Sequence, residues 1–327
     1  MPSPPRSRAA LTRRLVALIL LAAGVFLVSL LVGSSGLGWQ RMVGAIAGDG
    51  DEAARSILLA VRLPRVLAAF GVGGLLALAG VLLQALFRNP LADPYVLGVS
   101  GGAAVAALLA LLCGAGALAV QSAAGVGALG AVAIVYLLAR GGGTPRLLLT
   151  GVVVASACGA IVSVLLSLAD SSRVRGMVFW LAGDLEWAMD PRPSAAAAVI
   201  AVVLAVLVAR PLNVLAAGEL RARSVGLNLE AWRALVFIAC AALTAVAVVS
   251  AGTVGFVGLV TPHALRLMFR TSDHRVIAPA AALAGGTLLA TADLVARAAA
   301  APRQLPVGAV MAIIGAPCFL LLLRGRG

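Results

Sequence analysis

Residues 63–94 read LPRVLAAFGVGGLLALAGVLLQALFRNPLADP, and they contain both a membrane span and the segment that ends it. No charged residue occurs between Arg65 and Arg88. A helix rises 1.5 Å per residue and the bilayer core is about 30 Å thick, so about 20 such residues cross it. Pro90 and Pro94 cannot continue a helix, and irregular backbone at membrane depth needs protein or a water-filled cavity beside it. We therefore predict a spanning helix, followed by a segment that either lines a pathway or is only a rigid turn.

The composition extends this prediction to the whole chain. Of 327 residues, 62% are hydrophobic and 11% are charged, against about 25% charged in an ordinary soluble domain. Ten spans would use about 200 residues. We predict an all-α polytopic membrane protein with a single transmembrane domain over residues 1–327, which excludes soluble enzymes, disordered chains and fibres. The expected spans are 15–33, 63–85, 96–113, 118–139, 147–168, 194–210, 232–250, 254–269, 277–298 and 306–323.

All 25 basic residues are arginine. Without lysine the chain has no Walker A phosphate site and forms no Schiff base. Most arginines fall on one side of the membrane when residues 1–14 form a cytoplasmic tail, as the positive-inside rule requires. The net charge of +13 therefore indicates topology and not nucleic-acid binding. An even number of spans places both termini in the cytoplasm.

The long polar connection over residues 212–228 can form a short amphipathic helix between Gly218 and Gly226. It is either a docking element for a cytoplasmic partner or a passive linker. Asp293 lies inside an expected span, and Arg297 follows four residues later on the same helix face, where the two can pair. Ion-coupled secondary transporters generally need intramembrane carboxylates, so that class is the alternative and not the first choice. The cysteines and histidines have no metal-binding spacing, and no metal is expected.

An ordered set of stretches from about residue 55 to the C-terminus resembles one family, the FecCD/vitamin B12-type permease of bacterial ABC importers for ferric siderophores, haem and cobalamin. Any one stretch alone is weak, whereas the ordered set is specific. The stretches are Arg62–Arg65, Gln84 with Arg88–Pro94, Leu97–Gly101, Arg146–Gly151, Trp180–Gly183, Gly218–Gly226, Gly255–His263, Asp273–Arg275, Ala292–Arg297, Leu305–Gly308 and Gly315–Pro317.

The resemblance implies a type II ABC importer fold and a set of partners. A second permease subunit, identical or different, forms a dimer whose interface holds the pathway. Two copies of a cytoplasmic ABC ATPase bind ATP and magnesium, and an extracytoplasmic binding protein delivers the substrate. The chain itself is then not an enzyme and binds no cofactor, which agrees with the missing Walker A lysine.

The resemblance also implies roles for particular residues. Arg62, Arg65 and Arg297 would face the outside and engage acidic residues of the binding protein; the alternative is structural pairing, such as Arg297 with Asp293. Asn89 and Leu91 match an inner constriction, or gate. Thr144 and Pro145 fall at a second constriction, although Pro145 replaces the small hydroxyl residue expected there. The segment 212–228 matches the coupling helices that contact the ATPase, with Gly218, Glu219, Arg221, Ala222, Arg223, Ser224 and Gly226 as the matched positions.

These expectations together predict a multi-pass permease of the bacterial cytoplasmic (inner) membrane. It would translocate an iron complex by ATP-driven alternating access, with a ferric siderophore as first choice and haem or cobalamin as further ones. The substrate and the choice between homodimer and heterodimer stay open at this point.

Overall fold

The computed structural model of the chain describes residues 8–33, 39–48, 52–188 and 190–324, and every regular element in these ranges is helical. In chain order the elements are α1 (Arg8–Leu31), α2 (Trp39–Ala47), α3 (Glu52–Ile57), the π-helical turn η1 (Leu58–Arg62), α4 (Leu63–Phe87), η2 (Pro94–Leu97), α5 (Val99–Leu112), α6 (Ala117–Ala139), α7 (Gly143–Leu168), α8 (Ser171–Ala182), η3 (Leu185–Trp187), α9 (Arg192–Leu207), α10 (Ala209–Ala216), α11 (Glu219–Ser224), α12 (Leu229–Ala251), α13 (Val257–Phe269), α14 (His274–Ala298) and α15 (Val307–Arg324).

Each of the ten expected spans coincides with helical structure. Six segments are long and apolar enough to cross a membrane alone, namely α1, the continuous helix Glu52–Phe87, α6, α7, α12 and α14. The bent pair α9 and α10, which meet at 69°, forms a seventh, and α5, α13 and α15 are shorter apolar helices. Within the described residues the structure therefore confirms the prediction of an all-α protein with about ten spanning helices.

The boundaries differ from the expected ones at both ends of the first two spans. Helix α1 already begins at Arg8, so the predicted tail 1–14 is shorter, and residues 1–7 lie outside the described residues. The second span begins at Glu52 and passes through η1 before Pro64. The helices continue past these charged residues because a helical backbone satisfies its own hydrogen bonds whatever its side chains are. The long arginine side chains can extend from the helix toward the polar boundary of the membrane.

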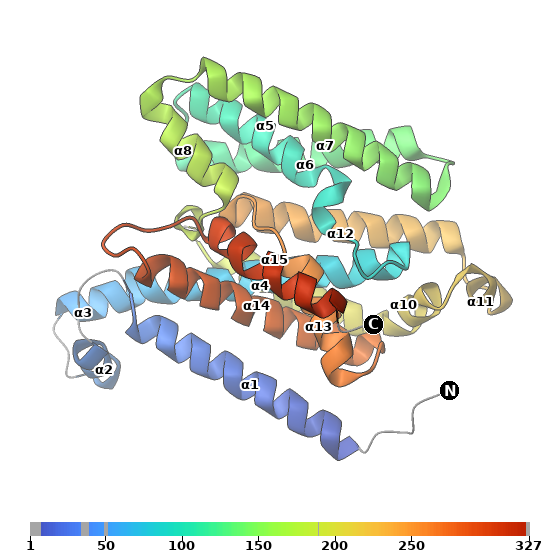
Figure 1. Cartoon of the computed structure of the whole chain (residues 1–327), viewed down its shortest axis with the longest axis horizontal. Helices are drawn as coiled ribbons and strands as arrows, with labels where there is room; N and C mark the ends of the chain where they lie inside the picture. The colour runs from blue at the N-terminus through green and yellow to red at the C-terminus, as the bar shows by residue number, and fades with distance from the viewer. Residues whose placement is uncertain (1–7, 34–38, 49–51, 189, 325–327) are drawn as a thin grey trace.

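Helix α4 occupies the centre of the bundle. Its neighbours are α14, α12, α9 and α13, and most of its residues are buried (Figure 1). Glycines permit this close packing: a methyl group added at Gly80 would lie 1.9 Å from the carbonyl oxygen of Gly258, and one at Gly73 would lie 2.3 Å from that of Gly285. Small residues at helix crossings are the usual means of close approach in membranes.

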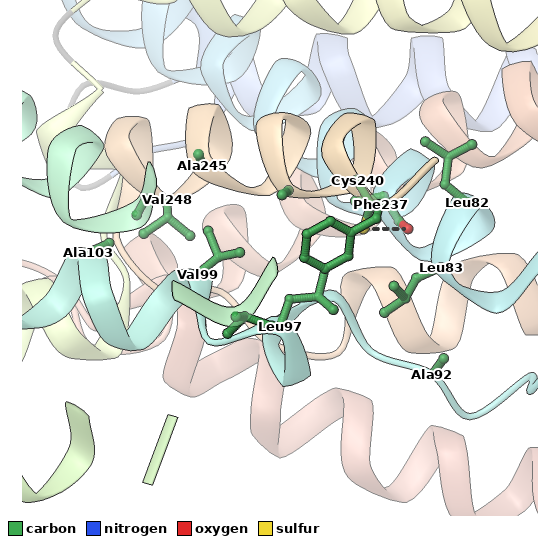
Figure 2. Packing of buried hydrophobic residues seen from close by; sticks show 14 of the residues in the cluster. Leu82, Leu83, Ala92, Leu97, Val99, Ala103, Phe237, Cys240, Ala245 and Val248 are labelled. Atoms are coloured by element: carbon green, nitrogen blue, oxygen red, sulfur yellow. Dashed lines mark hydrogen bonds between the residues drawn. The ribbon is translucent and has the colours of Figure 1, made fainter. Parts of the chain in front are cut away.

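Helices α5, α6 and α7 form a group beside this centre, and α12 joins the two parts. The junction is a buried apolar cluster to which Leu83 of α4, Leu97 of η2, Val99 of α5 and Phe237 of α12 contribute, as Figure 2 shows. The thiol of Cys240 donates a hydrogen bond to the carbonyl oxygen of Ala79 at 3.3 Å within it. The cluster therefore places the turn after α4 against the body of the bundle.

The bundle has two distinct ends. Helices α2, α3 and α8 lie at one end, which we name the α8 end, and α10 and α11 lie at the other, the α11 end (Figure 1). The first turn of α1 and the last turn of α15 also lie at the α11 end. The ends of the described chain are thus on the same side of the bundle.

Candidate functional site

Arg65 is the centre of a buried ionic network at the α8 end. Its Nε donates to Oδ1 of Asp293 at 2.9 Å, and its Nη1 donates to Oε1 of Gln304 at 2.9 Å. Nη2 lies 3.5 Å from Oδ1 of Asp184. Nη1 also points toward the exposed Glu186, at 4.0 Å. The network therefore reaches from the interior of the bundle to its surface.

The same network includes Arg297. Its Nε donates to Oδ2 of Asp293 at 2.8 Å, so both oxygens of one carboxylate bind a guanidinium. Arg62 lies one helical turn before Arg65. Its Nη1 donates to the carbonyl oxygens of Leu30 and Leu31 at 2.8 and 2.7 Å. A charge buried in this way requires such partners, because an unpaired one would cost several kcal/mol.

The three arginines predicted to dock a binding protein are buried in the isolated chain. Their exposed fractions are 2% for Arg62, 8% for Arg65 and 4% for Arg297. The structure thus shows the intramolecular pairing that was the alternative for Arg297, and docking stays a prediction. Sequence reasoning missed Asp184 and Gln304, since neither follows a charge pattern; the position of Asp184 directly after the Trp180–Gly183 motif was the available signal.

Asp184 lies in the loop between α8 and η3. Burial raises the pKa of Asp184, although the N–H of Glu186 and the charge of Arg65 act in the opposite direction. Its Oδ1 accepts the N–H of Glu186 at 3.0 Å, as an N-cap does.

The turn after α4 carries the predicted inner gate. Arg88 adopts a left-handed conformation with φ of 51°, and the Oδ1 of Asn89 accepts the N–H of Leu91 at 2.9 Å. Asn89 and Leu91 are exposed. Asp93 closes the turn by accepting the N–H of Tyr95 at 2.8 Å. The structure thus shows a hydrogen-bonded turn, and the role of Asn89 and Leu91 as a gate stays a prediction.

The residues of the second predicted constriction lie in a different element from the expected one. Thr144 and Pro145 do not lie in a connection between helices but in the first turn of α7, which begins at Gly143. Proline is tolerated there because the first N–H groups of a helix have no partner inside it. Pro145 is exposed, and for Thr144 the structure describes only the backbone.

The predicted coupling segment 212–228 consists of the end of α10, the short helix α11 and the connection to α12. Leu212 and Ala222 are buried and fasten the segment to the bundle. Leu220 and Val225 are 88% and 61% exposed. These two apolar side chains are therefore exposed on a segment that also carries exposed arginines. The remaining predicted positions Arg221, Arg223, Ser224 and Gly226 are also exposed, and Gly218 is half-buried.

A second connection joins this segment to α14. The side-chain N–H of Asn213 donates to Oδ1 of Asp273 at 2.8 Å, and the backbone N–H of His274 donates to Oδ1 of Asn213 at 2.9 Å. Asp273 also caps α14 by accepting the N–H of Arg275. Helices α10 and α14 are therefore held together at the α11 end, and Asn213 is another residue that sequence reasoning missed.

Helix α7 is the least covered of the long helices. Only 6% of its spanning window is buried, and its exposed apolar residues include Leu149, Val153 and Leu168. It contacts α5 and α6 along one side. Its remaining surface is available to lipid or to another subunit.

The comparisons with known proteins agree with this architecture. The sequence model of the FecCD transport family matches residues 19–325. The chain is 44% identical over 304 residues to the cobalamin import system permease protein BtuC of Halobacterium salinarum, covering 90% of this chain and 81% of that protein. It is 42% identical over 275 residues to the vitamin B12 import system permease protein BtuC of Klebsiella pneumoniae, covering 82% of each.

Solved structures give the same result for the fold. A structure titled as an inward-facing conformation of a metal-chelate type ABC transporter matches with a TM-score of 0.85 and 29% identity, covering 96% of this chain and 99% of that one. PsaBC from Streptococcus pneumoniae matches with a TM-score of 0.58 and 18% identity, which shows the fold alone. The arrangement of helices is thus that of a type II ABC importer permease.

Proposed function

The chain belongs to the FecCD transport family, and from that premise we propose that it imports a cobalamin across the cytoplasmic membrane. Family membership establishes the coarser function, that of a membrane permease subunit of an ABC importer of the FecCD/BtuC type. ATP hydrolysis in such importers belongs to a separate subunit, and the ion-coupled secondary transporter is no longer the alternative.

The observation that carries the choice of substrate is the identity of the relatives. Two permeases named for cobalamin or vitamin B12 match at 44% and 42% identity over most of their length. This supports a cobalamin ahead of the ferric siderophore that the sequence motifs alone favoured. The ferric siderophore stays as the second candidate, because the structural match at a TM-score of 0.85 is described as a metal-chelate type transporter.

The proposal places a binding protein at the α8 end. The gathering of Arg62, Arg65 and Arg297 at this end supports it. Because these side chains are buried, docking requires that carboxylates of the binding protein replace internal partners. Glu186 is the first that would be replaced, since it is exposed and only 4.0 Å from Nη1 of Arg65. Arginine suits such an exchange, because it stays charged and can bind a carboxylate with two hydrogen bonds.

The proposal places the two ATPases, with their ATP and magnesium, at the α11 end, where the exposed Leu220 and Val225 support a protein contact. Two permease subunits would pair beside α7 and enclose the pathway. Closure of the ATPases on ATP would move α11, and the Asn89–Leu91 turn and the first turn of α7 would open or close the inner mouth. Conduction in this chain involves no covalent step.

Uptake into proteoliposomes tests the proposal. The permease is reconstituted with its cognate ATPase and binding protein, and import of radiolabelled cyanocobalamin is compared with that of a ⁵⁵Fe-loaded hydroxamate siderophore. We expect ATP-dependent import of cyanocobalamin and none without the ATPase. Import of the siderophore alone would reject the cobalamin and favour the second candidate, and import without the ATPase would reject the mechanism.

A further inference from the structure

Glu219 connects three helices at the α11 end. It is the first residue of α11, and its Oε1 lies 3.6 Å from Nη2 of Arg88. The same oxygen accepts a hydrogen bond from Nη2 of Arg233. Arg88 is the C-cap of α4, and Arg233 lies in the second turn of α12. One carboxylate therefore ties the exposed helix α11 to two long helices of the bundle.

Arg88 also sets the direction of the chain after α4. Its φ of 51° is unfavourable for a residue with a side chain, and such a conformation persists only where the surroundings hold it. The guanidinium lies over the start of α11, since a methyl group at Gly218 would be 3.7 Å from Nη1 of Arg88. Asn89 and Leu91 follow directly. A displacement of Glu219 therefore acts on the residue that orients the predicted gate.

The cluster is too exposed to contribute much to stability. The side chains of Arg88 and Glu219 are 47% and 40% exposed, and exposed ion pairs have small effects on the free energy of unfolding. The cluster instead connects two parts of the protein. One is the surface of α11, where the ATPase is proposed to dock, and the other is the backbone of the turn after α4. A residue of this kind can be removed while the fold is kept.

We propose that Glu219 is a positioning residue that couples α11 to the Arg88–Leu91 turn, so that movement of the ATPase reaches the inner mouth through this carboxylate. The inference rests on the proposed function, because it assumes that an ATPase docks on α11. The inference goes beyond the proposed function because it names the side chain, Glu219, and the contacts through which the movement of the ATPase reaches the turn.

The first test needs no transport. A nitroxide is attached to Leu91→Cys in the full-length permease in nanodiscs, after replacement of the native cysteines by serine or alanine. We expect Glu219→Gln to increase the mobility of the label. Arg88→Gln should do the same, with no further increase in the double variant, because each variant removes the Glu219–Arg88 pair that holds the turn. Glu230→Gln, which removes a carboxylate from the first turn of α12 outside the cluster, is the matched control. An unchanged spectrum for Glu219→Gln, or additive effects, would overturn the proposal.

The second test measures coupling in the assembled importer. We expect Glu219→Gln to assemble with the ATPase as well as the wild type does, but to hydrolyse about threefold more ATP per cyanocobalamin imported, with Glu219→Asp in between. An unchanged ratio would overturn the coupling role even if the label becomes mobile. If the wild type imports no cyanocobalamin, the proposed substrate fails, and the mobility of the label together with the ATPase rate still decides the role of Glu219.

Discussion

At the scale of single residues, the defining feature is a carboxylate shared by two buried guanidinium groups. Asp293 is 1% exposed and binds Arg65 through one oxygen and Arg297 through the other. Each charge is costly to remove from water alone, and together they are stable only as a set. This explains how a permease can carry buried arginines inside its helices.

The first prediction concerns that carboxylate. Asp293→Asn should destabilise the protein by about 3–5 kcal/mol. It removes the carboxylate that pairs with the buried Arg297 and the nearest of the three carboxylates around Arg65. The measurement is the thermal midpoint of the detergent-purified protein by fluorescence-detected size exclusion. Asp190→Asn is the control, since Asp190 pairs with the exposed Arg192 and its loss should leave the midpoint unchanged. Equal midpoints for Asp293→Asn and the wild type would contradict the role of the network.

A pH dependence follows from Asp273. Burial opposes its ionisation, but the hydrogen bonds from Asn213 and from the N–H of Arg275, with the charge of Arg275, lower the pKa of Asp273 below its ordinary value. The ionised form therefore stabilises the folded protein above the ordinary pKa of about 4, and this stabilisation is lost as the pH falls through the lowered pKa.

The measurement is the difference in thermal midpoint between the wild type and Asp273→Asn at several pH values. We expect the wild type to be more stable near pH 7 and the difference to shrink below about pH 4. A difference that is independent of pH would show that the charge of Asp273 does not hold α10 to α14.

At the scale of elements, the crossing of α4 over α13 and α14 determines the centre of the bundle. The crossing is possible because glycine faces glycine: Gly80 faces Gly258, and Gly73 faces Gly285. The backbones therefore meet with no side chain between them, and dispersion contacts and packing replace the hydrophobic effect that water would provide.

Gly80→Ala should prevent this crossing, because its methyl group would lie 1.9 Å from the carbonyl oxygen of Gly258. We expect a severe loss of monodisperse protein after extraction. Gly130→Ala on α6 is the matched control, since no atom lies within 4 Å of the added methyl group, and it should stabilise the helix by about 0.5–1 kcal/mol. Wild-type yield for Gly80→Ala would mean that α4 and α13 are farther apart than described.

Helix α11 provides a second prediction at this scale. Leu220→Asp should weaken binding of the cognate ATPase about tenfold or more, because a charge replaces an apolar contact at the centre of the proposed interface. Binding is measured by biolayer interferometry on nanodiscs. Leu118→Asp is the control, because Leu118 is 73% exposed but lies in the first turn of α6 at the opposite end. Equal affinities for Leu220→Asp and wild type would place the ATPase contact elsewhere.

At the scale of the whole molecule, the notable feature is that α7 is almost uncovered, since only 6% of its spanning window is buried. A helix that is apolar and almost uncovered can face lipid, but the pathway of an importer must be enclosed by protein. A second copy that packs its own α7 against this one would enclose it. Helix α1 lies on the opposite side of the bundle from α7 (Figure 1) and would then face the bilayer.

This arrangement predicts a cross-link between two copies. In a background without native cysteines, Val153→Cys on α7 should form a disulfide-linked dimer in membranes after mild oxidation, whereas Leu20→Cys on α1 should not. Both residues are exposed and apolar, so the two variants should cross-link to the same extent if α1 and α7 both face only lipid. A lack of cross-linking at position 153, or equal cross-linking at both, would contradict pairing of identical chains through α7.

The sequence by itself determined the class of the protein, its spans and its family. A stretch of about 20 apolar residues forms a helix when it crosses a bilayer, because every backbone N–H and C=O group must find its hydrogen-bond partner within the stretch itself. Ordered motifs such as Arg88–Pro94 were sufficient for the family. The relevant information in both cases is local, so no knowledge of the packing was needed.

Only the tertiary structure decided which charges meet. Arg65 and Asp184 are 119 positions apart, and Glu219 contacts Arg88 although the two residues are also far apart in the sequence. Such pairs depend on how the helices pack, which a pattern along one helix does not contain. The same holds for the burial of Arg62 and Arg297, because whether a side chain faces lipid, protein or water follows from its neighbours in space. Because of this packing, three arginines expected at the surface are buried and bind groups inside the protein.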